Sequence, residues 1–408
     1  MSFDNTKECL LSLLSNALFQ KPLDIPENTD FKLVYEESLY QAVCSLAFSS
    51  AKDLLDADVK SKWELSFNMD TLRNSVISFG HTQVHNLLSN ANIDYVILKG
   101  CVSASYYPVP MLRRLGDVDF LVKPEDFDRA KEVFIQNGFQ LLKINHEYEV
   151  EFRKDDVTFE LHRRVNGIPD NKLGRKIDKL FSDVFEKSEL VQTDFSTYMS
   201  PSVFHHGLVM LLHVARHMIT GGIGLRHLCD WAVFVNDLSD DFESVFKDRL
   251  QSIGLWKFAQ ILTQLSTRYI GCPVQKWAAE IDEELLNALK DDIFEGGNFG
   301  KKDLKRADEA KFITSRKDGS VSSKSNFSQA IVSANEIVRK HWSFAHKLPI
   351  VYPFGWLYFG GKYIVKTIFG KREKKNINAL IKGADKRKEI YNQLRLFEGD
   401  ENEFKIAK

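Results

Sequence analysis

Residues 96–122 read VILKGCVSASYYPVPMLRRLGDVDFLV, and this stretch decides the fold. An apolar run ends in Lys-Gly, and a second apolar run begins with Gly-Asp-Val-Asp. Because side chains alternate between the two faces of a β-strand, Asp117 and Asp119 share one face, and Val118, Phe120 and Val122 share the other. Such a pair of carboxylates is unfavourable in a core unless a cation lies between the oxygens, and hard oxygen ligands suit Mg²⁺ or Mn²⁺. We therefore predict a divalent-metal site at this strand.

A third carboxylate lies in a later alternating run, VTFELHR at residues 157–163. If the two strands are neighbours, Glu160 converges with Asp117 and Asp119, which would hold one or two divalent ions against a triphosphate. His162 shares the face of Glu160. As a metal ligand it suits Zn²⁺ or Mn²⁺ better than Mg²⁺, so we expect a hydrogen-bonding role near the base or acceptor, or a purely structural histidine.

Together these motifs resemble the uncharacterised bacterial nucleotidyltransferase family of the DNA polymerase β-like nucleotidyltransferase superfamily. The residues that carry the resemblance are Leu98-Lys99-Gly100, Arg113 or Arg114, Asp117-x-Asp119, Glu160-x-His162, and a block formed by residues 213–217 and 224–230. The resemblance runs from about Leu10 to about Leu238. It implies a metal-dependent enzyme that transfers a nucleoside monophosphate from an NTP to an acceptor.

The resemblance also implies roles for individual residues. Asp117, Asp119 and Glu160 would be catalytic and bind Mg²⁺ (or Mn²⁺), with Glu160 also a candidate base. The residues expected to bind the nucleotide are Lys99, Gly100, Ser103, Arg113, Arg114, His162, His213, His217 and Arg226. Because Cys101 stands where the superfamily commonly has Ser, Ser103 or the free N–H groups after Gly100 would contact the phosphates. The acceptor could be a sugar, a lipid-linked molecule, a protein or an RNA, and surface-polysaccharide or lipid-linked sugar metabolism is the expected setting.

Several of these residues have a second interpretation. Lys99 could form a structural ion pair instead of a phosphate contact, and one of the two arginines could be merely solvated. His213 and His217 stand four apart, a spacing that can hold Zn²⁺, and with Asp230 they could form a hydrolase site. The Glu of the usual zinc-helix motif is absent, which favours a packed or nucleotide-facing histidine pair. Arg216, Arg226 and Asp230 could pair across the turn between their helices.

The expected fold is α+β, a small mixed sheet flanked by helical regions. Its parts are an N-terminal helical region (1–92), the nucleotidyltransferase core (93–198), a helical domain closing on the nucleotide (199–295), a mobile loop or linker (296–325) and a C-terminal helical tail (326–408). Within the first part we expect helices over 35–55 and 60–91. The second of these has Leu65, Leu72, Val76 and Phe79 among its apolar positions, and should pack on the sheet or form an acceptor surface. Asp155-Asp156 should turn a hairpin.

The charge balance and the cysteine content bear on possible partners and on location. The 55 basic and 56 acidic residues nearly cancel, so no global field attracts nucleic acid. Five widely spaced cysteines fit neither a disulfide framework nor a zinc site, and no signal peptide is apparent, so we expect a cytoplasmic protein.

The tail has an unusual apolar segment. Residues 348–361 are uncharged, shorter than the ~18 residues of a membrane span, and basic residues follow as far as 375. Aromatic residues beside a basic cluster are typical of peripheral contact with the inner face of a membrane through 348–375; a packed or partner-binding segment is the alternative. If the acids have lost their activity, the chain would instead be a nucleotide-sensing or scaffold protein that docks through this segment.

Overall fold

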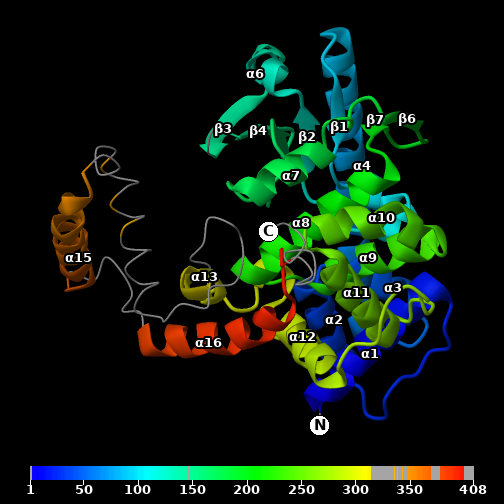
Figure 1. Cartoon of the computed structure of the whole chain (residues 1–408). Coiled ribbons are helices and arrows are strands. Elements are labelled where there is room, and N and C mark those ends of the chain that lie inside the picture. The colour runs from blue at the N-terminus through cyan, green and yellow to red at the C-terminus, as the bar shows by residue number, and fades with distance from the viewer. Residues whose placement is uncertain are drawn as a thin grey trace.

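The computed structural model describes residues 2–145, 148–313, 335, 338, 342, 348–368 and 377–398. In Figure 1 a mixed sheet with its covering helices lies above a larger group of helices, and α15 stands apart from both. The combination of a small mixed sheet with helical regions on either side confirms the predicted α+β class.

The first four helices are α1 (Ser2–Phe19), α2 (Phe31–Tyr40), α3 (Cys44–Ala51) and α4 (Ala57–Asn90). The prediction of one helix over 35–55 is wrong, because Ala42 has a left-handed φ of 56° and separates α2 from α3. The second predicted helix is present as α4, but it begins at Ala57, three residues before the predicted start: the side chain of Asp56 accepts a hydrogen bond from the Val59 N–H and caps the helix.

The central sheet contains five strands in the spatial order β1-β2-β5-β4-β3. Their bounds are β1 (Tyr95–Ile97), β2 (Val118–Val122), β3 (Gln140–Asn145), β4 (Glu149–Lys154) and β5 (Val157–His162). The β2–β5 pair is parallel, and the other pairs are antiparallel. The hairpin between β4 and β5 turns at Asp155 and Asp156, which both have positive φ, as predicted.

One face of this sheet is apolar and covered. Phe120 and Phe159 pack with Phe134 of α6 (Phe127–Gln136), and Val84 of α4 joins the same cluster. The opposite face carries Asp119 and therefore remains available for chemistry. After β5 the chain continues through α7 (Lys172–Leu180) and a two-stranded sheet of β6 (Glu189–Gln192) and β7 (Thr197–Ser200).

The lower group of helices includes α8 (Val203–Thr220), α9 (Leu225–Leu238), α10 (Asp241–Ser252), α11 (Trp256–Leu265) and α12 (Glu283–Gly296). These helices share one hydrophobic cluster with α1 and α3, in which Trp231 and Phe242 are almost fully buried. In Figure 1 α8 lies beneath the sheet, so its residues can face the acidic strands.

The interpretation of 296–325 as a mobile loop is wrong for its first part. Residues 306–313 form α13 (Arg306–Ile313), and the buried Arg306 pairs with Asp292 at 3.0 Å. A later helix, α16 (Ile377–Gln393), packs on α13, and its Arg387 donates hydrogen bonds to main-chain carbonyls at the end of α8. Residues 314–325 of the expected linker lie outside the described residues.

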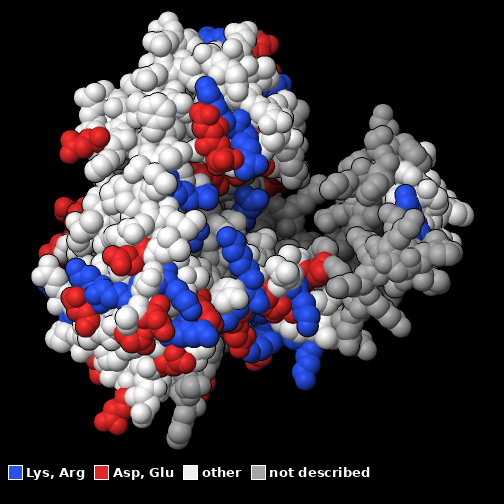
Figure 2. Space-filling model, turned by 180° about the vertical axis from the view of Figure 1, so that it is seen from behind, with Lys and Arg blue, Asp and Glu red and all other residues white. Residues whose placement is uncertain are grey.

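Charge on the surface is mixed. Figure 2 shows Lys and Arg side chains intermingled with Asp and Glu on the face it draws, without a broad area of one sign. This agrees with the balanced composition. Among the described residues, no helix is long and apolar enough to cross a bilayer.

Candidate active site

The parallel pairing of β2 with β5 brings the predicted acids together. Asp119 lies directly opposite Glu160, and Leu121 lies opposite His162. Residues opposite each other on neighbouring strands point to the same face. One ligand atom from each of Asp119, Glu160 and His162 lies within 4.8 Å of the others, the arrangement needed to hold a metal ion. The expected pairing of the two strands is therefore confirmed.

His162 lies at the centre of this group. Its Nε2 is 3.4 Å from Asp119 Oδ1 and 3.5 Å from Glu160 Oε2, yet has hydrogen-bond geometry to neither. On the other side of the ring, Asn166 Nδ2 donates to Glu149 Oε2 at 2.7 Å and lies 3.5 Å from His162 Nδ1. A buried nitrogen without a partner, aimed between two carboxylates, fits an imidazole ligand of a divalent ion.

The ionisation of the group follows from burial and close charges. Burial and then the charges of neighbouring Asp119 and Asp117 raise the pKa of Glu160 to about 7, although its close contact with His162 opposes this. Burial opposes protonation of His162, but its contacts with Asp119 and Glu160 raise its pKa to about 9. Although burial opposes ionisation of Asp119 also, Lys99 and His162 hold the pKa of Asp119 well below its usual range. Without a metal, protonated side chains thus neutralise the carboxylates.

Asp117 occupies a different position from the one expected. It precedes β2 and lines the cavity, but it is outside the group formed by Asp119, Glu160 and His162. Burial and the charge of Asp119 raise its pKa. The Asp-x-Asp pattern predicts that Asp117 and Asp119 are both metal ligands. In the structure, the residue that joins Asp119 and Glu160 is His162.

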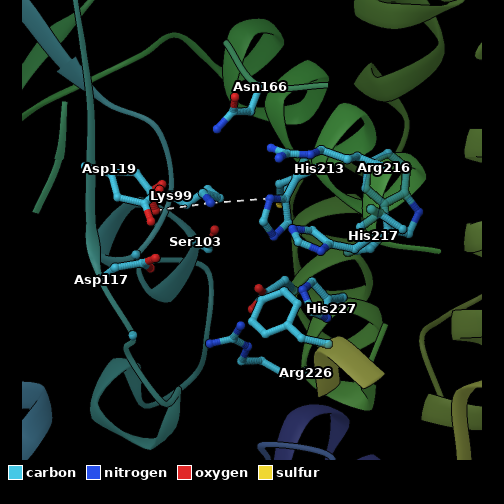
Figure 3. A pocket seen from close by; sticks show the side chains of 18 of the residues that line it. Lys99, Ser103, Asp117, Asp119, Asn166, His213, Arg216, His217, Arg226 and His227 are labelled. Carbon is cyan, nitrogen blue, oxygen red and sulfur yellow. Dashed lines mark hydrogen bonds and ion pairs between the residues drawn. The ribbon is translucent and has the colours of Figure 1, made fainter. Parts of the chain in front are cut away.

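Lys99 connects the two walls of the site. Its Nζ lies 3.1 Å from Asp119 Oδ2 and 3.3 Å from His213 Nδ1. Figure 3 shows Asp117, Asp119 and Lys99 on one side of the pocket and the histidines and arginines of α8 and α9 on the other. The structural ion pair, one of the two interpretations of Lys99, is therefore present, and the ammonium group still lies inside the cavity.

The second wall is aromatic and electrically neutral at its centre. His213, His217 and His227 pack around Phe299, with ring centres of His217 and Phe299 4.6 Å apart. Burial, followed by the charge of Lys99, lowers the pKa of His217 to about 3, and burial similarly lowers the pKa of His213 and His227. His213 and His217 therefore act as neutral rings that meet edge to face. They join no metal-binding group among the described residues.

Asp230 belongs to no metal-binding group among the described residues. The predicted pairing of Asp230 with Arg216 and Arg226 is wrong. The Asp230 carboxylate instead accepts two hydrogen bonds of 2.7 Å from Arg113 and one of 2.6 Å from the Tyr107 hydroxyl. Arg113 is 6% exposed and borders the cavity. Its guanidinium group is thus already engaged, because Nε and Nη2 donate to the two carboxylate oxygens of Asp230. Of the two predicted arginines, Arg114 is not a lining residue, and its Nε lies 3.4 Å from Asp70.

Arg226 differs from Arg113 because no described carboxylate lies within ion-pair distance of it. Its Nε is buried without a hydrogen-bond partner, Nη1 donates to the Arg114 carbonyl at 3.4 Å, and the guanidinium covers the Phe299 ring. A buried cation without an anion is unfavourable. Burial and the neighbouring charge of Arg113 accordingly lower its pKa. An anionic ligand in the cavity would remove this penalty.

The loop after β1 is closely packed around Gly100. Its φ is +66°, and a Cβ there would lie 2.9 Å from His81 Nε2, so both conformation and space require glycine. The helix that follows, α5 (Cys101–Ala104), is a single turn. Ser103 Oγ lies 3.3 Å from His206 Nε2 and borders the cavity.

These elements enclose a cavity of about 270 Å³. Most residues predicted to bind nucleotide line it, with the exceptions of Arg114 and His162. Several other residues that line the cavity were not predicted to do so from the sequence, namely Glu149, Asn166, Arg216, His227 and Phe299. Arg216 and His227 lie within the motif block that carried the family resemblance, whereas Phe299 lies in a stretch that looked like a loop.

A family model described as "uncharacterised nucleotidyltransferase" matches residues 32–271. Comparisons with curated proteins and with solved structures gave no significant match. The matched residues comprise more than half of the chain and contain both strands of the acidic group and both helices of the opposite wall. This chain therefore belongs to the uncharacterised nucleotidyltransferase family.

Proposed function

We propose that this chain transfers a nucleoside monophosphate from an NTP to an acceptor hydroxyl or phosphate, in a reaction that requires a divalent ion. The observation that supports this most directly is the opposition of Asp119, Glu160 and His162, across one cavity, to Arg226, which has no carboxylate partner among the described residues. Carboxylate and imidazole donors fit Mg²⁺ or, better, Mn²⁺. A divalent ion there would neutralise charge on the triphosphate and make its α-phosphorus a better electrophile.

The side chains of the chain itself would perform the remaining steps. Arg226 would bind phosphate oxygens and compensate the charge of the leaving pyrophosphate. The rings of His217 and Phe299 offer a stacking surface for the base. An acceptor oxygen would attack the α-phosphorus, forming one P–O bond while the bond to the β-phosphate breaks. Asp117 lines the cavity but lies outside the group formed by Asp119, Glu160 and His162. We therefore propose that Asp117 is the general base that accepts the proton of an acceptor hydroxyl, the role that the sequence suggested for Glu160.

Release of pyrophosphate tests this proposal. The protein is incubated with Mg²⁺ or Mn²⁺ and each NTP in turn, together with a sugar, lipid, protein or RNA fraction that could supply the acceptor. Pyrophosphate formed only with metal and only with an acceptor fraction would support the proposal and identify the class of acceptor. Release of inorganic phosphate alone, without pyrophosphate, would contradict it.

Substitution of Arg226 by Met should weaken NTP binding by about 10–100-fold, because hydrogen bonds to charged groups contribute about 1.5–3 kcal/mol. Thermal stability of the ligand-free protein should not fall, since the lost cation has no described carboxylate partner. Isothermal titration with a non-hydrolysable NTP and a thermal melt measure the two effects. Arg249→Met is a matched control because Arg249 also covers a phenylalanine ring, that of Phe204, away from the cavity. Equal affinities of the two variants would contradict the role of Arg226.

We also propose that the tail contacts an anionic membrane surface. Helix α15 (Tyr352–Ile368) turns Tyr352 and Trp356 toward Val338 and Trp342, whereas Phe354 and Leu357 are 66% and 75% exposed. Residues 362–375 contain six Lys or Arg and a single acid. An exposed apolar face beside such a basic stretch fits an acidic bilayer surface.

Replacing both Phe354 and Leu357 by Glu should abolish binding to vesicles of phosphatidylserine and phosphatidylcholine, as measured by co-sedimentation. The control is Leu304→Glu, which alters another exposed leucine, 82% exposed, outside α15. Binding that survives the double substitution would exclude α15 as the contact.

A further inference from the structure

Helix α4 carries a row of large apolar side chains that no other described element covers. The row contains Leu65, Met69, Leu72, Val76 and Phe79, which are 63%, 64%, 68%, 40% and 59% exposed. The helix already buries a different face, including Trp63, Ile77 and Val84, against the rest of the molecule. The expectation that the apolar positions of this helix pack on the sheet is therefore wrong for this row. Exposed apolar residues in a contiguous row usually mark an interaction surface.

The spacing within the row is regular. Consecutive members are 4, 3, 4 and 3 residues apart. This is the a/d pattern of the heptad repeat, in which each apolar side chain inserts between four residues of a facing helix. A helix that merely covers a globular core needs a wider apolar stripe. The row therefore suits pairing with one other helix along its length, and α4 is long enough, with 34 residues, to present two heptads.

We propose that this row pairs with the same row of a second copy of the chain, forming a two-fold dimer through α4. A second copy necessarily supplies a helix with matching spacing. In an antiparallel pair, Leu65 faces Val76 of the other copy and Met69 faces Leu72, so the four central layers each contain two apolar side chains, whereas Phe79 lies opposite Lys62 at either end.

The flanks of the row permit such self-association. One flank consists of the uncharged residues Ser61, Asn68, Ser75 and Thr82, which occupy successive g positions. Like charges at these positions would repel when identical helices meet, and none is present. Small polar side chains also let the two helices approach closely. The other flank, at the e positions, contains Ser66, Arg73 and Gly80, so each copy brings a single cation there. On the g flank no charge opposes a contact between two copies.

The size of the row predicts the strength of the dimer. Five side chains, each about half exposed, offer roughly 500 Å² of surface per copy, less than the ~800 Å² per partner of a standard stable interface. We therefore expect a reversible dimer that forms in the micromolar range of concentration and dissociates on dilution.

Light scattering coupled to gel filtration tests the proposal over a range of concentrations. The full chain should move from its monomer mass of 46.9 kDa toward twice that value as concentration increases. The double variant Met69→Glu/Leu72→Glu should remain monomeric. Its melting temperature at low concentration should match that of the wild type, because both side chains are already exposed in the single copy.

A matched control is Val274→Glu, which alters a 77% exposed apolar residue outside α4 and should dimerise like the wild type. A wild type that stays monomeric at every concentration overturns the proposal and leaves the row to another partner. A double variant that still dimerises also overturns it, because the interface would then lie elsewhere.

Discussion

Replacing Asp119 by Asn should lower the rate of nucleotidyl transfer by at least about 10³-fold, because the loss of a buried ligand removes the ion that stabilises the phosphates. Asp119 is 4% exposed and lies within reach of Lys99 and His162, so its charge is already compensated in the fold. Turnover is measured as pyrophosphate release at saturating NTP. The affinity for Mn²⁺ is measured separately by electron paramagnetic resonance, and should fall with turnover.

Asp117→Asn separates the two roles assigned to the acids. If Asp117 accepts the proton of an acceptor hydroxyl, this variant should lose about 10²–10⁴-fold in turnover while retaining Mn²⁺ affinity. An equal loss of Mn²⁺ affinity in both variants would make Asp117 a metal ligand, as the Asp-x-Asp pattern alone predicts, and would rule out its assignment as base. Asp94→Asn, which alters a surface carboxylate paired with Lys123, should change neither quantity.

Replacing Asp230 by Asn should destabilise the protein by about 3–5 kcal/mol, because it leaves Arg113 as a buried charge without a counter-ion. Both members of the pair are almost fully buried, and asparagine keeps only one of the two oxygens that accept from Arg113 and Tyr107. Unfolding by urea, monitored by circular dichroism, measures the change in the free energy of unfolding. The pair joins the loop before β2 to α9, so the variant should also loosen the cavity wall.

A surface pair provides a control. Arg268 lies 2.9 Å from Glu283, and the two side chains are 61% and 69% exposed, so Arg268→Ala should change stability by no more than about 1 kcal/mol. The double variant Arg113→Met/Asp230→Leu should recover much of the stability lost in Asp230→Asn, because it removes both charges together. A change below about 1 kcal/mol in Asp230→Asn would contradict the structural role of the pair.

The local pattern was sufficient to predict the acidic strands. Alternation along residues 117–122 and 157–163 placed Asp119, Glu160 and His162 on one face, and the parallel pairing of β2 with β5 brought them together. These features depend on properties of a few consecutive residues.

Features that depend on distant contacts were not predictable in the same way. Asp230 and Arg113 are 117 positions apart, and nothing in either segment indicates that they meet. The break between α2 and α3 at Ala42 contains no Gly or Pro, so the sequence does not indicate it. The apolar residues of α4 show helical periodicity, but periodicity cannot tell whether an apolar face is covered by the same chain or left exposed. Phe299 was missed because its surroundings have the composition of a loop.

The most direct test of the account is a comparison of NTP labelled at the α-phosphate with NTP labelled at the γ-phosphate, in the presence of Mn²⁺ and the acceptor fraction that supports pyrophosphate release. Nucleotidyl transfer predicts that label from the α-position alone appears on the acceptor, and that Asp119→Asn abolishes it. Transfer of the γ-label would contradict the account and indicate a kinase-like reaction. Absence of any transfer, with NTP still bound at the cavity, would contradict it in favour of a nucleotide-sensing protein.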